Sequence, residues 1–400
     1  MDKVMIGGTG ITPFGKFLES SVRALAERAV ADALKDAAVE IDDVDMVFFG
    51  NAAGGLLNGQ ECVRGQVALR NSGLLGKPIV NVENACASSS TAFRLAHMAV
   101  ASGSAEVALA IGAEKMSNED RTKPIKALET AADVEELEAL KARISPDGAG
   151  TGSVFMDLYS SVARDYMVTS GATAEDFARI SVKQRHAGAL NPIAQFRADV
   201  DIEEVLTSRM IADPITLMMC SSIGDGAAAL VVMSEAAAAR RNIQPVQILA
   251  CEIRSGQGDD PDALPVATAA SRGAFEAAGL GPEDLSVVEL HDAAAPAELI
   301  LSEQLGLCAP GEAVSLLYSG RTALGGAMPI NPSGGLISKG HPIGATGAAQ
   351  LVELADQLRG RAGSRQVPGA RIGLAENGGG WIGDDAAAAV VTILGATAQH

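Results

Sequence analysis

The chain has 400 residues, of which 48% are hydrophobic and 3% aromatic, and its formal net charge is −18. That charge argues against a protein that binds nucleic acid or an anionic membrane, since both attract basic surfaces. The five cysteines are scattered without a C-x-x-C pair, which argues against a disulfide framework and against a zinc site. Because the N-terminus also lacks the pattern of a signal peptide, we expect a cytoplasmic location.

Short apolar runs alternate with helical patterns along the first part of the chain. Ser20 and Ser21 are plausible caps for the first of these helices. Alternation of this kind is typical of parallel or mixed sheets covered by helices, so we expect an α/β fold. The expected strands are 4–6, 44–51, 77–81 and 106–112, and the expected helices are 22–34 and 91–103.

Cys86 lies where the run 77–81 gives way to a helix, within Asn84-Ala85-Cys86-Ala87-Ser88. A thiol at a helix N-terminus feels the positive end of the helix dipole, which favours the thiolate. The stretch therefore suggests a nucleophilic Cys86. The alternative is a small cysteine that packs the start of a helix.

Charged residues crowd together after the strand at 106–112. They predict a surface insertion, a loop domain at about 114–220. We interpret the acidic run 133–138 as a solvated helix face. Lys115, Arg121 and Lys123 are expected at the solvated surface.

The order of elements is repeated later in the chain. A helix, an acidic turn and a buried strand follow Ala33 and Asp43, and the same order returns 241 residues later at Ala274 and Asp284. A repeat of this size predicts two similar halves that arose by duplication. We expect an N-terminal half at 1–240, which includes the loop domain, and a C-terminal half at 241–400.

Four loops fall at equivalent strand ends of this duplicated plan, where ligands of α/β sheets gather. They carry Cys86, His291, His341 and the run 376–383. A cysteine with a histidine is the minimal set for acyl transfer by a thiolate, because the histidine takes the thiol proton. Either histidine could instead be structural. No role is expected for His97, His186, His400, Cys62, Cys220, Cys251 and Cys308.

Several motifs together resemble the thiolase superfamily, over essentially the whole chain. Gly340-His341-Pro342-Ile343-Gly344-Ala345-Thr346-Gly347 is similar to the C-terminal histidine motif of thiolases, and the Cys86 stretch resembles their nucleophile loop. His291-Asp292 stands where most thiolases have Asn-Glu. It resembles the thiolase domain of sterol-carrier-protein thiolases, as do Gly112–Ser117, Ala189–Arg197 and Gly224–Ala228.

The resemblance implies a five-layered αβαβα fold, with two duplicated halves and an inserted loop domain. It also implies coenzyme A thioesters as substrates, no permanently bound cofactor, a homodimer or homotetramer, and a place in lipid metabolism. By position, Cys86 would be acylated and His341 would activate it. His291 would help to hold a water in one oxyanion site, and the backbone N–H groups of Cys86 and Gly378 would form the other.

The sequence departs from the family at the acid/base residue. Most thiolases have a second cysteine where this chain has Glu376, and the sterol-carrier branch has one where this chain has Ala293. Either Glu376 or His291 is therefore a candidate base. We expect thiolysis of a 3-ketoacyl-CoA, or Claisen condensation of acyl-CoAs, through acyl-Cys86. The alternative is an aldolase or acyltransferase subunit that acts with a zinc-ribbon/OB-fold partner on a bulky CoA ester.

Overall fold

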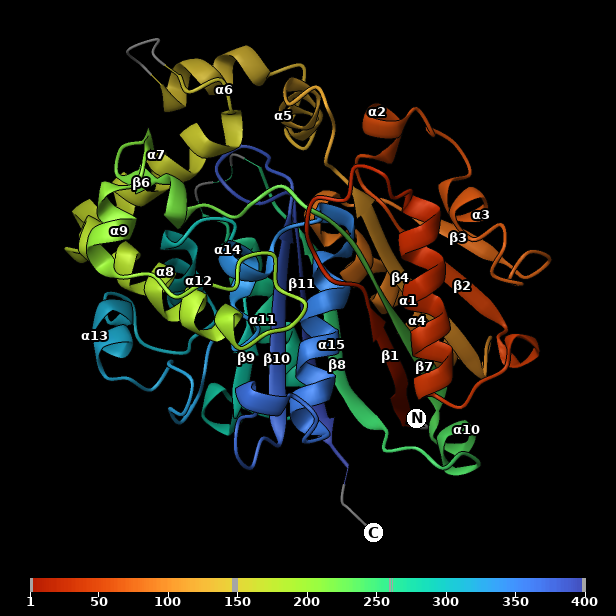
Figure 1. Ribbon diagram of the computed structural model, residues 1–400. Coiled ribbons are helices and arrows are strands. Elements are labelled where there is room, and N and C mark those ends of the chain that lie inside the picture. The colour runs from red at the N-terminus through yellow and green to blue at the C-terminus, as the bar shows by residue number, and fades with distance from the viewer. Residues whose placement is uncertain (1–2, 146–149, 259, 261, 398–400) are drawn as a thin grey trace.

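A computed structural model describes residues 3–145, 150–258, 260 and 262–397. Nine of the strands that it describes form one sheet in the order β3-β2-β4-β7-β1-β8-β11-β10-β9, and β5 and β6 form a separate pair (Figure 1). The strands are β1 (Val4–Ile11), β2 (Met46–Gly50), β3 (Ile79–Val82), β4 (Val107–Lys115), β5 (Met210–Ala212), β6 (Ile215–Thr216), β7 (Asp225–Ser234), β8 (Val246–Ser255), β9 (Val287–Glu289), β10 (Ile372–Gly379) and β11 (Ala388–Ala396).

The pairing pattern repeats in the two parts of the sheet. On one side β2 pairs in parallel with β4, and β4, β7 and β1 pair antiparallel in turn. On the other side β9 pairs in parallel with β10, and β10, β11 and β8 pair antiparallel in turn. Between the two parts, β1 and β8 pair through two described residue pairs, Met5 with Gln247 and Ile6 with Val246. The repeat expected from the sequence is therefore present in the strand topology.

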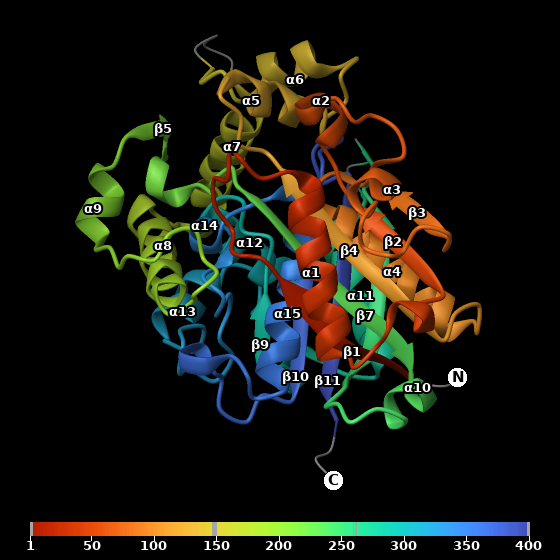
Figure 2. The ribbon, with the colours of Figure 1, turned by 45° about the vertical axis from the view of Figure 1, so that its right-hand side comes forward.

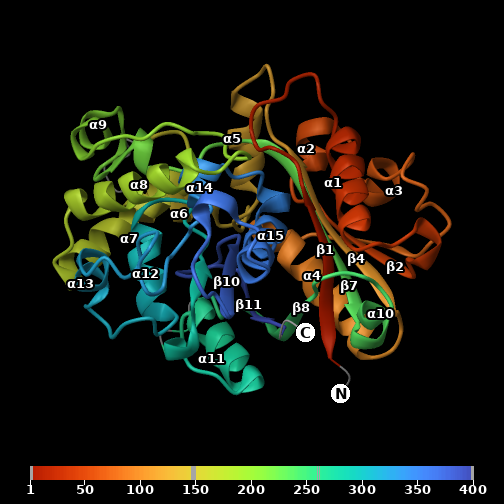
Figure 3. The same cartoon turned by 60° about the horizontal axis from the view of Figure 1, so that its bottom comes forward.

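Three groups of buried apolar residues define the layers. One group joins α1 (Val22–Asp36) to the outer face of the first sheet part, and α1 lies across these strands in Figure 2. A second group joins α4 (Ser88–Ala101) and α15 (Thr346–Leu358) to the inner faces of both parts (Figure 3). A third joins α11 (Val266–Ala278) to the outer face of the second part. This succession confirms the predicted five layers.

The remaining helices lie in the insertion and in the connections between strands. Those of the insertion are α5 (Thr122–Glu129), α6 (Leu137–Ile144), α7 (Val154–Ser170), α8 (Ala174–Ala189) and α9 (Ile202–Thr207). Those of the connections are α2 (Gly54–Asn58), α3 (Arg64–Ala68), α10 (Glu235–Ala239), α12 (Pro296–Gln304), α13 (Ala313–Tyr318) and α14 (Gly335–Lys339). None of the helices described is both long enough and apolar enough to cross a lipid bilayer.

The expected surface position of Lys115 is wrong. The strand β4 continues to Lys115, and both Glu114 and Lys115 are buried. The Lys115 ammonium lies 3.1 Å from the carboxylate of Asp225, which explains how a lysine can be buried there. The acidic residues from Asp133 to Glu136 are exposed, as expected, but they precede α6 and do not form a helix face.

Candidate active site

Cys86 lies in the single 3₁₀ turn Ala85–Ala87 that joins β3 to α4. Ala85 has a φ of +47°, which places this alanine in the left-handed region. The Ser88 hydroxyl supports the turn, since it accepts from the Asn84 N–H at 2.9 Å and donates to the Ala85 carbonyl at 2.6 Å. The helix α4 starts at Ser88, earlier than the expected Thr91. Cys86 lies just before it and is buried, with 9% of its surface exposed.

The resting thiol of Cys86 is neutral. Loss of hydration, followed by the nearby Glu114 carboxylate, raises the pKa of Cys86 to about 12. Hydrogen bonds from the backbone N–H groups of Cys86 and Gly380 act in the opposite direction but are weaker. The expectation that the helix start favours a thiolate is therefore wrong for the free protein, because burial outweighs the helix dipole. A base must remove the proton when substrate arrives.

His341 is placed to be that base. Its backbone N–H donates to the carbonyl of Ser222 at 3.0 Å, and its Nδ1 lies 2.7 Å from the Thr346 hydroxyl oxygen. When that hydroxyl donates its one hydrogen to the Pro342 carbonyl, 3.1 Å away, it accepts from a protonated Nδ1, and the lone pair of His341 is then on Nε2. Burial, with a smaller contribution from His291, holds the pKa of His341 well below its usual range.

His291 follows β9 and faces His341. The two Nε2 atoms are 3.5 Å apart, and the rings meet edge to face with centroids 5.1 Å apart. Loss of hydration lowers the pKa of His291 to about 4, so its ring is neutral at physiological pH. The Cys86 sulfur and one ring nitrogen from each histidine all lie within 4.8 Å of one another. The fold thus brings together three residues that the sequence proposed from three separate loops.

Glu376 borders the same space from β10. Its side chain is 2% exposed, and its Oε2 accepts from the His291 backbone N–H at 3.2 Å. Loss of hydration raises the pKa of Glu376 to about 7. A Cβ on Gly378 would lie 3.4 Å from His291 Nδ1 and 3.5 Å from Glu376 Oε1. Because Gly378 has no side chain, the space between the His291 imidazole and the Glu376 carboxyl stays open.

Gly378 and Gly380 lie differently with respect to the thiol. Gly378 is paired with Ala389 of β11, whereas Gly380 follows the strand. The backbone N–H groups of Gly380 and of Cys86 itself act to lower the pKa of the Cys86 thiol, against the effect of its burial.

Glu114 is a residue that sequence reasoning missed. Its buried carboxylate accepts from the backbone N–H groups of Ala52, Ala53 and Gly344 at 2.9, 3.3 and 3.2 Å, and from the Asn51 side chain at 2.9 Å. It therefore ties the loop after β2 to the loop that follows His341. Burial raises the pKa of Glu114 to about 7. The available signal was a glutamate within an otherwise apolar strand.

Buried charges also anchor the histidine loops. The Lys339 ammonium lies 3.2 Å from the Glu289 carboxylate and 2.9 Å from the Ser333 hydroxyl. Asp292 accepts from the Leu336 N–H at 2.8 Å, which fixes the residue after His291 to α14. These contacts hold the backbone that carries the imidazoles.

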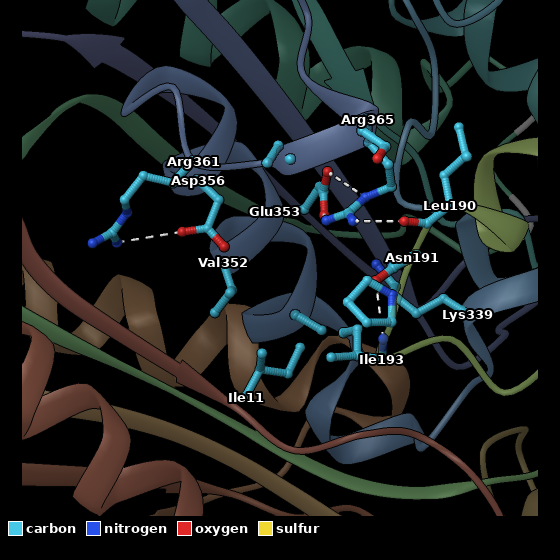
Figure 4. Close-up of a pocket in the computed structure, with 15 residues that line it drawn as sticks. Ile11, Leu190, Asn191, Ile193, Lys339, Val352, Glu353, Asp356, Arg361 and Arg365 are labelled. Atoms are coloured by element: carbon cyan, nitrogen blue, oxygen red, sulfur yellow. Dashed lines mark hydrogen bonds and ion pairs between the residues drawn. The ribbon is translucent and has the colours of Figure 1, made fainter.

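A separate cavity of about 370 Å³ lies beside α15 (Figure 4). Its lining includes Leu190, Asn191, Glu353 and Arg365, and the Arg365 guanidinium lies 2.8 Å from the Glu353 carboxylate. Cys86, His291, His341 and Glu376 are not among the residues that line it. This cavity is therefore distinct from the site of the chemistry.

Comparisons with known proteins agree with this geometry. The family models "Thiolase, N-terminal domain" and "Thiolase C-terminal domain-like" match residues 4–236 and 255–396. Acetyl-CoA acetyltransferase of Methanothermobacter thermautotrophicus is 39% identical over 385 residues, covering 95% of this chain and 97% of that protein. Sterol carrier protein 2 of Bos taurus is 36% identical over 395 residues, covering 94% of this chain and 70% of that protein.

The solved structure of the Ltp2-ChsH2(DUF35) aldolase superposes with a TM-score of 0.80 at 27% identity, covering 98% of both chains. The same conclusion follows from the sequence motifs, the strand topology, the loops that carry Cys86 and His341, and the two matching family models. The chain belongs to the thiolase family.

Proposed function

We propose that this thiolase-type acyltransferase cleaves a 3-ketoacyl-CoA with coenzyme A, or condenses two acyl-CoAs, through an acyl-Cys86 intermediate. The observation that supports it most is the approach of the Cys86 sulfur to the ring nitrogens of His291 and His341, all within 4.8 Å. The His341 tautomer, set by Thr346, leaves Nε2 as the acceptor of the thiol proton.

In the first half of thiolysis, Cys86 Sγ forms a bond to the 3-keto carbon while His341 Nε2 takes the thiol proton. The bond between the second and third carbons then breaks, and the departing carbanion of the CoA ester takes a proton from an acid in the site. In the second half, the thiol of coenzyme A attacks the acyl-Cys86 carbonyl and gives its proton to the conjugate base that the acid left in the first half. The sulfur of Cys86 leaves and recovers its proton from His341.

Two groups of donors suit the negative oxygens that form along this path. We assign the N–H groups of Cys86 and Gly378 to the oxyanion of the acyl-cysteine step, as the family resemblance implies, and the N–H of Gly380, which acts to lower the pKa of the Cys86 thiol, is a further candidate donor. His291 and His341 present their Nε2 atoms side by side. We assign this pair, with a bound water, to the oxyanion of the attacking thioester.

Glu376 is our candidate for the acid that replaces the missing second cysteine. Its carboxyl borders the space left open by Gly378, and it stands on the strand position where most thiolases carry the thiol. A positioned acid/base contributes about 10²–10⁴-fold to a rate, so the position has to be filled by a group that exchanges protons. His291 is the competing candidate, because its Nδ1 borders the same space.

A second function is an aldolase or acyltransferase subunit that acts with a zinc-ribbon/OB-fold partner on a bulky CoA ester. Two observations favour it. Neither usual position carries a second cysteine, and the chain is similar in structure to the Ltp2-ChsH2(DUF35) aldolase. The first function is favoured because the chain keeps both Cys86 and His341, with a ring nitrogen of His341 within 4.8 Å of the sulfur.

We further propose a homodimer or homotetramer in the cytoplasm, with a role in lipid metabolism. β3 stands at the open edge of the sheet, and its Val80 is exposed, so this strand can pair with a second chain. We place the boundary between the halves near residue 240, after α10, with the loop domain inserted in the first half. The two family models separate in the same region.

Intact mass spectrometry tests the covalent step. The purified chain is mixed with acetyl-CoA or with a longer 3-ketoacyl-CoA, and Cys86→Ala is treated in parallel. Cys62→Ser serves as the matched control, because Cys62 is an exposed thiol outside the site. An acyl adduct in the wild type and in Cys62→Ser, absent from Cys86→Ala, supports the proposal. Full thiolysis by Cys86→Ala contradicts it, and CoA-ester cleavage that survives this change favours the aldolase.

A further inference from the structure

We propose that Cys86, His291 and His341 form a binding site for a zinc ion, and that zinc bound there reversibly blocks acylation of the enzyme. The proposal goes beyond acyl transfer, and metal binding is measured without any thioester, so the two claims can fail separately. The cysteine spacing predicted no zinc site. The three donors come from loops far apart in the sequence and meet only in the folded chain.

The separations of the donor atoms suit a tetrahedral ion. Zinc binds imidazole nitrogen at about 2.0–2.1 Å, which places two such nitrogens roughly 3.3–3.4 Å apart in a tetrahedron. The Nε2 atoms of His291 and His341 are 3.5 Å apart. With sulfur bound at about 2.3 Å, the expected separation of sulfur and nitrogen is roughly 3.6 Å. The Cys86 sulfur is within 4.8 Å of one ring nitrogen of each histidine, so a movement of at most roughly 1.2 Å completes the set.

The histidines are also in the state that binds a metal. Imidazole binds through the lone pair of a neutral ring, and ligating histidines commonly donate their other N–H to a fixed partner. His341 suits such a role, because its Nδ1 lies 2.7 Å from the Thr346 hydroxyl and its Nε2 lies 3.5 Å from that of His291. His291 Nδ1 faces the space beside Gly378 and Glu376, on the side away from His341. Two imidazoles and a thiolate are donors that zinc favours.

The charges around the donors compensate a bound cation. Zinc with one thiolate and two neutral imidazoles has a net charge of +1. Glu114 is an acidic group near Cys86. Glu376 adjoins His291 from the other side. The nearby Lys339 ammonium opposes the cation, but it is paired with Glu289.

Zinc in this position blocks catalysis rather than assisting it. When the sulfur–zinc bond forms, the thiol proton passes to solvent, and the sulfur electron pair that would attack the thioester is bound to the metal. His341 Nε2 is occupied in the same way and can no longer accept a proton. Three protein ligands leave a fourth position for water.

Cobalt(II) is the probe, because tetrahedral cobalt with a thiolate ligand gives intense visible and charge-transfer absorption. We titrate the full-length Cys62→Ser chain, which lacks the exposed thiol, and then displace cobalt with zinc. The expected result is one equivalent bound with those bands. Changing Cys86→Ala or His291→Ala should weaken binding by at least about 100-fold. His186→Ala, an exposed histidine outside the site, should bind as the parent does.

A chemical control blocks the Cys86 thiol without a mutation that could impair folding. Alkylation of Cys86 with iodoacetamide in the Cys62→Ser chain should abolish cobalt binding, and prior zinc should protect the thiol from alkylation. Cobalt binding that persists after alkylation or in Cys86→Ala would overturn the site, as would the absence of binding in the parent chain. Acyl-adduct formation that proceeds normally with stoichiometric zinc bound would overturn the block.

Discussion

The imidazole of His341 is held by the residue that begins the next helix. Its Nδ1 lies 2.7 Å from the Thr346 hydroxyl oxygen, and Thr346 is the first residue of α15. The same hydroxyl lies 3.1 Å from the Pro342 carbonyl, and when it donates its hydrogen there it accepts from Nδ1–H. The start of one central helix thus sets the tautomer of the base, while the turn before the other, α4, carries the nucleophile.

Changing Thr346→Val tests this relationship. Valine keeps the shape of the side chain but leaves the buried Nδ1–H without a partner, which costs about 1–3 kcal/mol. We expect a decrease of roughly 10- to 100-fold in kcat/KM, because the tautomer with Nε2 unprotonated is no longer favoured. Thr346→Ser keeps the hydroxyl and should retain most of the rate. Equal rates in the valine and serine variants would show that the hydroxyl does not set the tautomer.

Gly378 and Gly379 should respond differently to alanine. A Cβ on Gly378 would make only ordinary contacts, at 3.4 Å to His291 Nδ1 and 3.5 Å to Glu376 Oε1. Gly378→Ala should therefore keep its melting temperature but lose about tenfold or more in kcat, because a methyl group displaces the reacting atoms. A Cβ on Gly379 would lie 2.3 Å from the Asn84 carbonyl oxygen.

Gly379→Ala should accordingly be destabilised, by about 1–3 kcal/mol or more, since backbone of the Cys86 turn cannot easily move away. Thermal unfolding and steady-state kinetics on both variants separate the two effects. A stable and fully active Gly378→Ala chain would mean that the space beside Glu376 is not where the substrate reacts.

The sequence predicted the features that depend on local pattern. The apolar spacing of α1, its cap at Ser21 and the repeat of elements 241 residues apart are all present in the structure. The convergence of Cys86, His291 and His341 followed from their places after strands of duplicated halves, because equivalent strand ends meet at one edge. The family motifs then supplied their roles.

What the sequence could not predict depends on burial and on contacts between distant segments. The composition of the Cys86 turn says nothing of the loss of hydration that raises the thiol pKa to about 12. Glu114 and Lys115 look like the start of a charged surface insertion, yet their partners Ala52, Gly344 and Asp225 lie far away in the chain. Contacts of this kind appear only once the strands are placed side by side.

Glu376→Gln separates the acid/base role from the nucleophilic one. The amide can still accept from the His291 N–H, but it cannot exchange a proton with the substrate carbon. We expect turnover in thiolysis or condensation to fall by about 10²–10⁴-fold. Acylation of Cys86 by acetyl-CoA, read by intact mass, should persist, because it breaks no carbon–carbon bond.

Glu376→Cys is the matched variant, since it restores the thiol that most thiolases carry at this position. It should recover a large part of the lost turnover. If Glu376→Gln turns over at the wild-type rate, the proton is handled by His291 instead, and His291→Asn should then show the loss.

The buried Glu114 should make the stability of the protein depend on pH. Its pKa is raised from 4.5 to about 7 in the folded chain, so the folded state holds this proton more tightly than the unfolded state does. The contribution of this carboxyl to the free energy of unfolding is therefore greatest below pH 4.5 and is lost as the pH rises through about 7. A shift of this size corresponds to a change on the order of 3 kcal/mol.

Urea unfolding between pH 5 and pH 8 measures this contribution as a difference between variants, because other buried groups titrate in the same range. Over this pH range, the free energy of unfolding of the wild type should fall by about 3 kcal/mol more than that of Glu114→Gln. Changing the exposed Glu119→Gln should leave the wild-type slope intact. Parallel curves for the wild type and Glu114→Gln would mean that Glu114 stays ionised in the folded chain. Its four hydrogen-bond donors would then fully offset its burial.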